Sequence, residues 1–206
     1  MGLISRFRHW QASRKEKRIE QLTAKAVDLS EDQEYDLIFL YVKGFVRAMA
    51  TGQSITEIYA EVENLIRKKL HVIVKPGTYF VSSGNHQNMV TRRDYSFTLF
   101  PCSSKRLNID AACINASLAV PGKNDRFYGV RRVSDKLSKF LEASKNSDPM
   151  VVQAGVWALT DGYTANQVKT HLVARDQYGH TRQAVSDSHI EEARRILNNL
   201  SIHNNL

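Results

Sequence analysis

All four prolines of this 206-residue chain lie between residues 76 and 149, and the long stretches on either side contain none. Proline fixes φ and has no N–H, so it is excluded from helix interiors. The two ends are therefore compatible with helices, and the middle with turns. We predict an α+β fold with N-terminal helices, a small antiparallel β-sandwich or barrel, and a C-terminal helical subdomain packed on the β domain. The expected bounds are 1–70, 71–133 and 134–206.

Apolar residues at helical spacing predict three helices in the N-terminal region, over about 3–27, 30–51 and 54–66. The second and third begin at candidate capping boxes, Ser30 with Gln33 and Ser54 with Glu57. These two helices are expected to form a hairpin.

The pattern changes period from residue 71. Short segments rich in β-branched and aromatic residues alternate with Pro, Gly, Ser and Asn turns, as in a small antiparallel sheet. The expected strands are 71–75, 78–81, 88–91, 95–100, 107–114 and 126–130. After them we expect helices over 135–144, 150–159, 168–173 and 188–200, with a polar hairpin or loop over 175–184. Thr164 with Gln167 and Ser188 with Glu191 are further candidate capping boxes.

The formal net charge of +8 belongs mainly to the middle of the chain. Residues 71–133 carry nine Lys and Arg against three acidic residues, whereas residues 134–206 carry eight of each. The start of the chain has no apolar segment with a small-residue cleavage site and resembles neither a secretory signal nor a myristoylation site. We expect a cytoplasmic location, with peripheral membrane attachment as an alternative, and reduced cysteines.

The first 18 residues contain six Lys and Arg but one Glu, beside several large apolar side chains. Such a helix can place apolar residues at a lipid headgroup boundary while its cations meet anionic lipids. The alternative is that it packs on its own domain or on a partner, with its charges in solvent. The candidate membrane or anion contacts are Arg6, Phe7, Arg8, Trp10, Arg14 and Lys15.

Three basic pairs stand at predicted strand ends or turns. Together with nearby aromatic residues they would make a stacking and phosphate-binding surface, provided that they gather on one face. In the alternative, the aromatic residues form the core and the arginines are solvated. The candidate anion-binding residues are Arg92, Arg93, Lys105, Arg106, Arg131 and Arg132.

Established catalytic and metal-binding motifs are missing. The seven histidines are scattered, and no paired Cys-x-x-Cys, His-Glu-x-x-His, EF-hand, Walker, G-x-G-x-x-G or G-x-S-x-G pattern is present. We therefore expect no metal and no cofactor.

The most specific pattern is Val-Gln-Ala-Gly-Val-Trp over residues 152–157, with Cys113-Ile114 lying 40 residues upstream of Gln153. It resembles the glutamine-containing motif in the thioester domains of Gram-positive surface adhesins, in which a β-sandwich is joined to a helical subdomain. The resemblance implies an internal thioester between Cys113 and Gln153, and covalent capture of a target amine. Here Gly155 stands where the family usually has alanine. In the alternative, Gln153 is a polar residue of a buried helix and Cys113 an inert core thiol.

These patterns predict a non-enzymatic binding or scaffold protein. One form of this prediction attaches the protein to a membrane surface through its basic N-terminal helix. The alternatives are a thioester protein using Cys113 and Gln153, and a nucleic-acid-binding module using the basic β-rich region. A protein partner or a second copy of the chain is expected, since the predicted apolar helix faces need covering.

Overall fold

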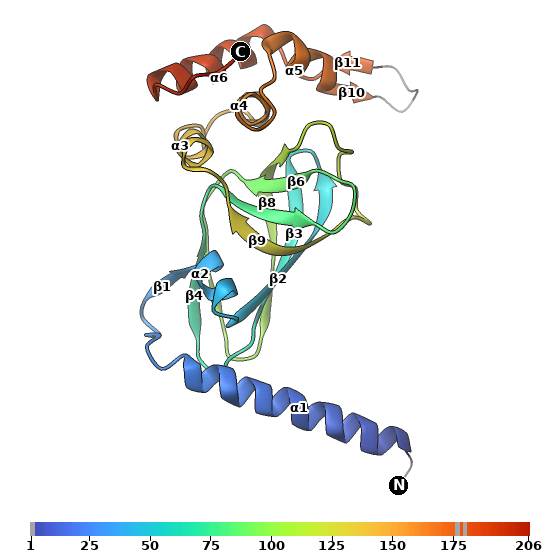
Figure 1. Cartoon of the computed structure of the whole chain (residues 1–206), viewed down its shortest axis with the longest axis vertical. Coiled ribbons are helices and arrows are strands. Elements are labelled where there is room, and N and C mark those ends of the chain that lie inside the picture. The colour runs from blue at the N-terminus through green and yellow to red at the C-terminus, as the bar shows by residue number, and fades with distance from the viewer. Residues whose placement is uncertain (1–2, 176–177, 179–180) are drawn as a thin grey trace.

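The computed structural model describes residues 3–175, 178 and 181–206, and their side chains from Trp10 onward except for Ala174 and Arg175. Its parts follow one another along the longest axis (Figure 1). A helical cap lies at one end and a β-barrel in the middle. A small sheet lies beyond the barrel, and the first helix projects at the opposite end. The predicted α+β class is confirmed.

The centre of the molecule is a closed barrel of six strands in which every neighbouring pair is antiparallel. The order around the barrel is β2 (Val46–Ser54), β3 (Glu57–Asn64), β8 (Ser104–Ile114), β6 (Asn88–Thr91), β5 (Thr78–Ser82) and β9 (Arg126–Arg132). All six predicted strands, from 71–75 to 126–130, match observed ones within a few residues. Of the two architectures expected, sandwich or barrel, the closed barrel is the one observed.

A second sheet extends the barrel toward the first helix. It consists of β1 (Glu34–Asp36), β4 (Leu70–Val74) and β7 (Tyr95–Leu99), with β1 parallel and β7 antiparallel to β4. The short helix α2 (Leu37–Val42) packs between this sheet and the barrel and is capped by Asp36, which accepts the N–H of Ile38 at 2.8 Å. Ser30 and Gln33 therefore do not cap a helix. Ser30 Oγ accepts the N–H of Asp32, and Gln33 Oε1 accepts the hydroxyl of Tyr35.

The predicted helices over 30–51 and 54–66 are wrong. The first range contains β1, the short helix α2 and the start of β2, and most of the second range forms β3. In β3, Ile58, Ala60 and Val62 are buried while the residues between them face outward, which is the two-residue period of a strand. Apolar residues there also fall at helical spacing, so the segment fits both periods, and pairing with distant strands decided the outcome. Ser54 is the last residue of β2, and its Oγ accepts the N–H of Thr56 in the following turn.

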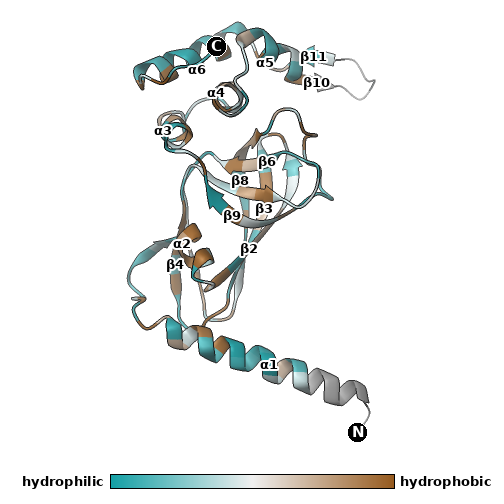
Figure 2. Ribbon diagram, in the orientation of Figure 1, coloured by the Kyte–Doolittle hydropathy of each residue, from teal (hydrophilic) through white to brown (hydrophobic). Residues whose placement is uncertain are grey.

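The first helix, α1 (Leu3–Lys25), confirms the prediction for that segment. Its C-terminal end is anchored: Leu22 packs against the barrel core, and Thr23 Oγ1 accepts the N–H of Arg67 at 3.0 Å. Residues 11–18 are all exposed, and the coloured part of α1 is predominantly hydrophilic (Figure 2).

The C-terminal residues form a helical cap over one end of the barrel (Figure 1). It contains α3 (Asp135–Ala143), α4 (Pro149–Thr160), α5 (Ala165–His171), α6 (Asp187–Asn199) and the two-stranded ladder of β10 (Val173–Arg175) with β11 (Thr181–Gln183). The predicted capping box of Thr164 and Gln167 is confirmed. The last helix is capped by Ser186 with His189, and not by Ser188 with Glu191.

Two hydrophobic cores meet at strand β8. One fills the barrel and continues into the small sheet, and the other lies between the outside of the barrel and the helical cap. Successive side chains of a strand point to opposite faces, so Ala111 and Cys113 enter the first core, and Ala112 and Ile114 enter the second. Among the described residues, no helix is long and apolar enough to cross a membrane.

Candidate functional site

Gln153 and Cys113, 40 residues apart in sequence, are in direct contact. Gln153 lies on α4, and its side-chain amide is completely buried. Its Oε1 accepts the backbone N–H of Cys113 at 2.8 Å, and its Nε2 donates to the carbonyl oxygen of Cys113 at 2.8 Å. The carboxamide thus pairs with Cys113 as a neighbouring β-strand would.

The course of β8 explains why these backbone groups are free to meet a side chain. β8 pairs with β3 as far as Asp110 and with β6 over 111–114. The N–H of Arg92 donates to the carbonyl of Asp110, and in an antiparallel ladder the hydrogen-bonded pairs recur every second residue. The N–H and C=O of Cys113 therefore point away from β6, toward the edge that β3 has left. Gln153 occupies that edge.

The thiol of Cys113 enters the barrel interior. Its Sγ lies 3.3 Å from Sδ of Met89 and donates to the carbonyl oxygen of Ile55 at 3.7 Å. Burial raises the pKa of the Cys113 thiol to about 12, because the thiolate is poorly solvated there. At neutral pH the sulfur therefore carries its proton, and solvent does not reach it.

A second contact fixes α4 against the end of β8. Asp161, the C-cap of α4, accepts the N–H of Ala116 through Oδ1 at 2.9 Å. Gly155 lies between the two contacts, and a Cβ there would be 2.0 Å from Cζ of Phe140. The glycine at this motif position thus allows α3 and α4 to approach each other.

A hollow of about 340 Å³ opens beside this junction, where β8 ends next to α4. It is lined by residues of the barrel, of α3 and of the end of α4, among them Asn88, Ile114, Asn115, Leu137, Leu159 and Thr160. Two of these lining residues, Ile114 and Asn115, directly follow Cys113 in the sequence, so the hollow lies next to the buried contact.

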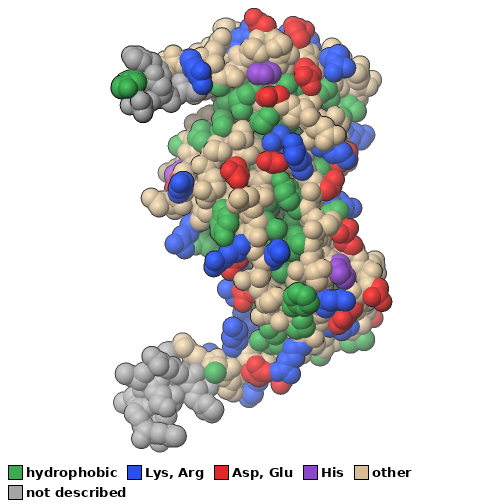
Figure 3. Space-filling model, turned by 180° about the vertical axis from the view of Figure 1, so that it is seen from behind, with side chains coloured by type: hydrophobic (Ala, Val, Ile, Leu, Met, Phe, Trp, Pro, Cys, Tyr) green, Lys and Arg blue, Asp and Glu red, His purple; other side chains and the backbone are tan. Residues whose placement is uncertain are grey.

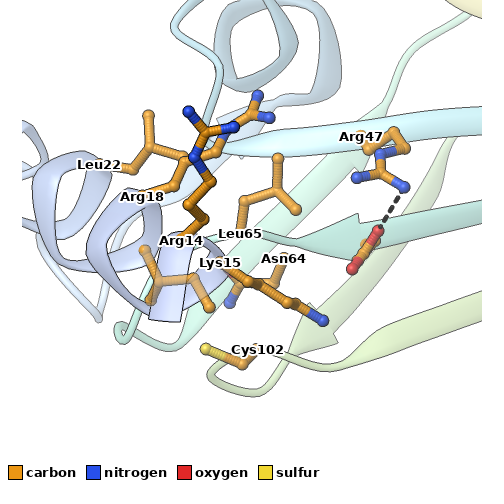
Figure 4. Close-up of a pocket in the computed structure, with 10 residues that line it drawn as sticks. Arg14, Lys15, Arg18, Leu22, Arg47, Asn64, Leu65 and Cys102 are labelled. Atoms are coloured by element: carbon orange, nitrogen blue, oxygen red, sulfur yellow. Dashed lines mark ion pairs between the residues drawn. The ribbon is translucent and has the colours of Figure 1, made fainter. Parts of the chain in front are cut away.

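A second candidate site is the groove between α1 and the barrel, which we call the α1 groove (Figure 4). It encloses about 550 Å³, has an apolar floor of Ile19, Leu22 and Leu65, and also contacts Asn64 and Cys102. Its charged side chains are Arg14, Lys15 and Arg18 from α1, Arg47 from β2 and Glu63 from β3.

The α1 groove includes two of the six residues predicted for membrane or anion contact, Arg14 and Lys15. The half-exposed ring of Trp10 lies 4.2 Å from the Arg14 guanidinium, which fits a cation–π contact. Arg6, Phe7 and Arg8 lie in the part of α1 whose side chains are outside the described residues.

The three predicted basic pairs are engaged by different acidic residues. Arg92 is only 2% exposed, with Nη2 3.8 Å from Asp110, and burial lowers its pKa; the adjacent Arg93 also meets Asp110, at 3.3 Å. Arg106 pairs with Glu61 at 3.1 Å, and Arg132 pairs with Asp36 at 2.5 Å. Lys105 and Arg131 are exposed. Arg106 lines a surface groove together with exposed aromatic side chains.

That groove lies on the outer face of the barrel. The sequence patterns did not predict it, since five of its eight lining residues come from β2 and β3, which were expected to be helices. We call it the barrel-face groove. It encloses about 430 Å³ and is lined by Met49, Ala50, Thr51, Tyr59, Glu61, Arg106, Arg126 and Tyr128. The alternation of apolar Ile58, Ala60 and Val62 with polar residues over 57–64 is the sequence signal that predicts a strand there.

Within the described part of the chain, no group of three His, Cys, Asp or Glu side chains is placed to hold a metal ion. Comparison with protein-family models, with curated proteins and with solved structures finds no match to this chain.

Proposed function

We propose that Cys113 and Gln153 form an internal thioester with which the protein captures a target amine. The observation that carries the proposal is the direct contact between the Gln153 carboxamide and the residue that bears the thiol. The thiol sulfur attacks Cδ of Gln153, an S–C bond forms, and the C–N bond to Nε2 breaks. The thiol proton goes to the departing nitrogen, so ammonia leaves and no oxidant is needed.

The hydrogen bond to Oε1 favours this step. Attack on the amide carbon moves negative charge onto Oε1, and the Cys113 N–H already points at that atom from 2.8 Å. A backbone N–H aimed at the oxygen where charge develops stabilises a tetrahedral intermediate, most strongly where water is excluded. The attack also requires Sγ to turn away from Met89 toward Cδ, a rotation about the Cα–Cβ bond of Cys113.

Capture then reverses the roles of the groups. An incoming primary amine attacks the thioester carbonyl, forms an amide with the former Gln153 side chain, and returns the Cys113 sulfur as a thiol. Because both residues are buried, the amine reaches them only when the seam between α4 and β8 opens. The hollow beside Ile114 and Thr160 offers an approach to that seam.

Intact mass spectrometry of the freshly purified chain tests the proposal. Thioester formation lowers the mass by about 17 Da through loss of ammonia, and methylamine replaces this deficit with a gain of about 14 Da. Cys113→Ala and Gln153→Glu are expected to abolish both changes, whereas the matched variant Cys102→Ala, at the exposed cysteine, should retain them. An unmodified mass in the wild-type chain, unchanged by methylamine, overturns the proposal and leaves the amide contact as a structural clamp.

A second function is favoured by a different observation, the projection of α1 from the body with cations along the α1 groove. We propose that the protein also acts as a non-enzymatic binding protein that docks an anionic partner at this groove. Arg14, Lys15, Arg18 and Arg47 outnumber the single acidic residue of the lining, Glu63. Such an excess attracts polyanions and raises their rate of encounter.

Retention on a heparin matrix tests docking. Arg14→Glu with Arg18→Glu should lower the salt concentration needed for elution more than Lys136→Glu with Lys139→Glu, which makes the same charge change at exposed positions of α3. Equal shifts for the two double variants would show that only net charge matters, and would contradict docking at the α1 groove.

A further inference from the structure

The α1 groove and the barrel-face groove are parts of one continuous surface. In the β2–β3 ladder Arg47 pairs with Glu63, Met49 with Glu61, and Thr51 with Tyr59. Residues two apart on a strand point to the same face. The Arg47–Glu63 rung, which lines the α1 groove, is therefore followed on the same face by the Met49–Glu61 rung, which lines the barrel-face groove. We call the joined surface the barrel-face strip.

We infer that single-stranded nucleic acid binds along the barrel-face strip. The inference rests on the docking function proposed for the α1 groove, and it names the class of partner. It extends the binding surface from α1 across β3 and β2 to β9.

The charges of the strip suit a chain of phosphates. Its two linings contain six cationic side chains and two acidic ones, Glu61 and Glu63. Glu63 neutralises Arg47, and Glu61 neutralises Arg106, each through an ion pair. An excess of four positive charges is left, carried by Arg14, Lys15, Arg18 and Arg126 at the two ends of the strip. On the face seen in Figure 3, Lys and Arg side chains are interspersed with Asp and Glu side chains and with exposed apolar side chains.

Two exposed tyrosines provide stacking surfaces between these charged ends. Tyr128 is 51% exposed and Tyr59 is 36% exposed. β2 lies between them, since Met49 pairs with Tyr128 on one side and Thr51 with Tyr59 on the other. Strands two places apart are separated by about 10 Å, which suits splayed bases stacking on separate aromatic rings.

The same features argue against a lipid surface and a duplex. Over residues 11–18, where its side chains are described, α1 is exposed and polar, so this part of the helix has no apolar face to place in a bilayer. Met49 and the tyrosines line a groove in the barrel wall, which a flat membrane does not enter. The bases of a duplex are stacked on one another and do not offer their faces to tyrosine. A single strand offers both phosphates and unstacked bases.

Fluorescence anisotropy with labelled 12-nucleotide oligo(dT) and oligo(U) tests the inference. The wild-type chain should bind at about 50 mM salt, and its affinity should fall steeply as salt is added. Tyr59→Ala and Tyr128→Ala should each weaken binding about tenfold, whereas Tyr59→Phe and Tyr128→Phe, which keep the ring, should bind like wild type. Phe39→Ala, at an exposed aromatic of α2 outside both grooves, is the matched control and should have no effect. Each removal of Arg14 or Arg18 should lower the slope of log affinity against log salt by about one.

The possible outcomes separate this inference from the docking function. If Tyr59→Ala and Tyr128→Ala bind the oligonucleotides as tightly as wild type does, the inference is overturned, because binding would then depend on charge alone. Binding to phosphatidylserine vesicles or heparin through Arg14 and Arg18, without oligonucleotide binding, also overturns it but leaves docking intact. Absence of binding to all of these probes refutes both. Unfolding curves that coincide with the wild-type curve ensure that a loss of binding is not a loss of fold.

Discussion

Replacing Gln153 by leucine tests the contact on which the main proposal depends. Leucine nearly fills the volume of the side chain but offers no partner to the N–H and C=O of Cys113, which lie at a completely buried residue. Leaving a buried polar group unpaired costs about 1–3 kcal/mol. With two groups orphaned, we expect the free energy of unfolding to fall by about 4 kcal/mol, and Tm by roughly 8–16 °C for a chain of this length.

Gln87→Leu is the matched control. Gln87 is also buried, but it donates a single side-chain hydrogen bond, from Nε2 to the carbonyl of Leu118 at 2.8 Å, and its Oε1 has no partner among the described residues. Since Leu118 is 40% exposed, water can replace part of the lost bond. The expected cost is about 1 kcal/mol.

The assay is urea unfolding followed by far-UV circular dichroism, made in the wild-type and in the Cys113→Ala background. Cys113→Ala removes any thioester, so the cost of Gln153→Leu measured there reports the amide contact alone. Any excess cost in the wild-type background reports the covalent link. Costs of Gln153→Leu and Gln87→Leu that agree within about 1 kcal/mol in the Cys113→Ala background would refute the assignment of Gln153 as the partner of the β8 backbone.

Three further predictions concern the surroundings of this contact. Gly155→Ala should destabilise the fold by about 1–3 kcal/mol in urea unfolding, because its Cβ would meet the Phe140 ring, and Phe140→Leu should recover part of the loss; stability equal to wild type would contradict the close packing of α3 and α4. Asp161→Ala should cost about 1–2 kcal/mol by removing the acceptor of the Ala116 N–H, whereas Asp161→Asn, which keeps an acceptor oxygen, should cost less; equal losses would contradict this role. Where Cys113 is a free thiol, burial holds its pKa at about 12 against an ordinary 9.0, so the folded state keeps a proton that the unfolded state loses. The corresponding stability is fully present below pH 9.0 and is lost as the pH rises toward 12, so unfolding at a series of alkaline pH values should show a steeper loss than Cys113→Ala shows; parallel profiles would contradict it.

The sequence predicts the fold well where local pattern and long-range pairing agree. Tyr95, Phe97 and Leu99 alternate with polar or outward residues in a segment bounded by turns, and they form β7 as expected. Thr164 and Gln167 cap α5 through their own side chains. The cap of α5 is formed within three residues, and in β7 the local alternation agrees with the pairing to β4.

The prediction fails where distant segments decide between two local possibilities. Ile55, Ile58 and Val62 fit a helical stripe. However, β3 pairs with its neighbour β2 and also with β8, and the residues of β8 lie about 45 positions further along the chain. Because β2 and β3 were expected to be helices, the sequence did not predict the barrel-face strip. By contrast, the motif around Gln153 pointed to Cys113, although nothing local to either residue fixes their contact. The burial of Arg92 was not foreseen, since its environment is created by the packing of β6 against β8.

Closure of the barrel between β2 and β9 has a consequence for synthesis on the ribosome. Met49 pairs with Tyr128, so the barrel cannot close until residues up to β9 have left the exit tunnel. Three apolar residues on the outside of the barrel stay uncovered until α4 and α6, which follow β9 in the chain, have been synthesised; they are Val90, Ala112 and Ile114. During this interval a nascent chain exposes an apolar patch beside the unpaired edge of β8. A chaperone that recognises exposed apolar segments would therefore find its binding site at the surface that later encloses the Cys113–Gln153 contact, and its release would be timed by the arrival of the helical cap.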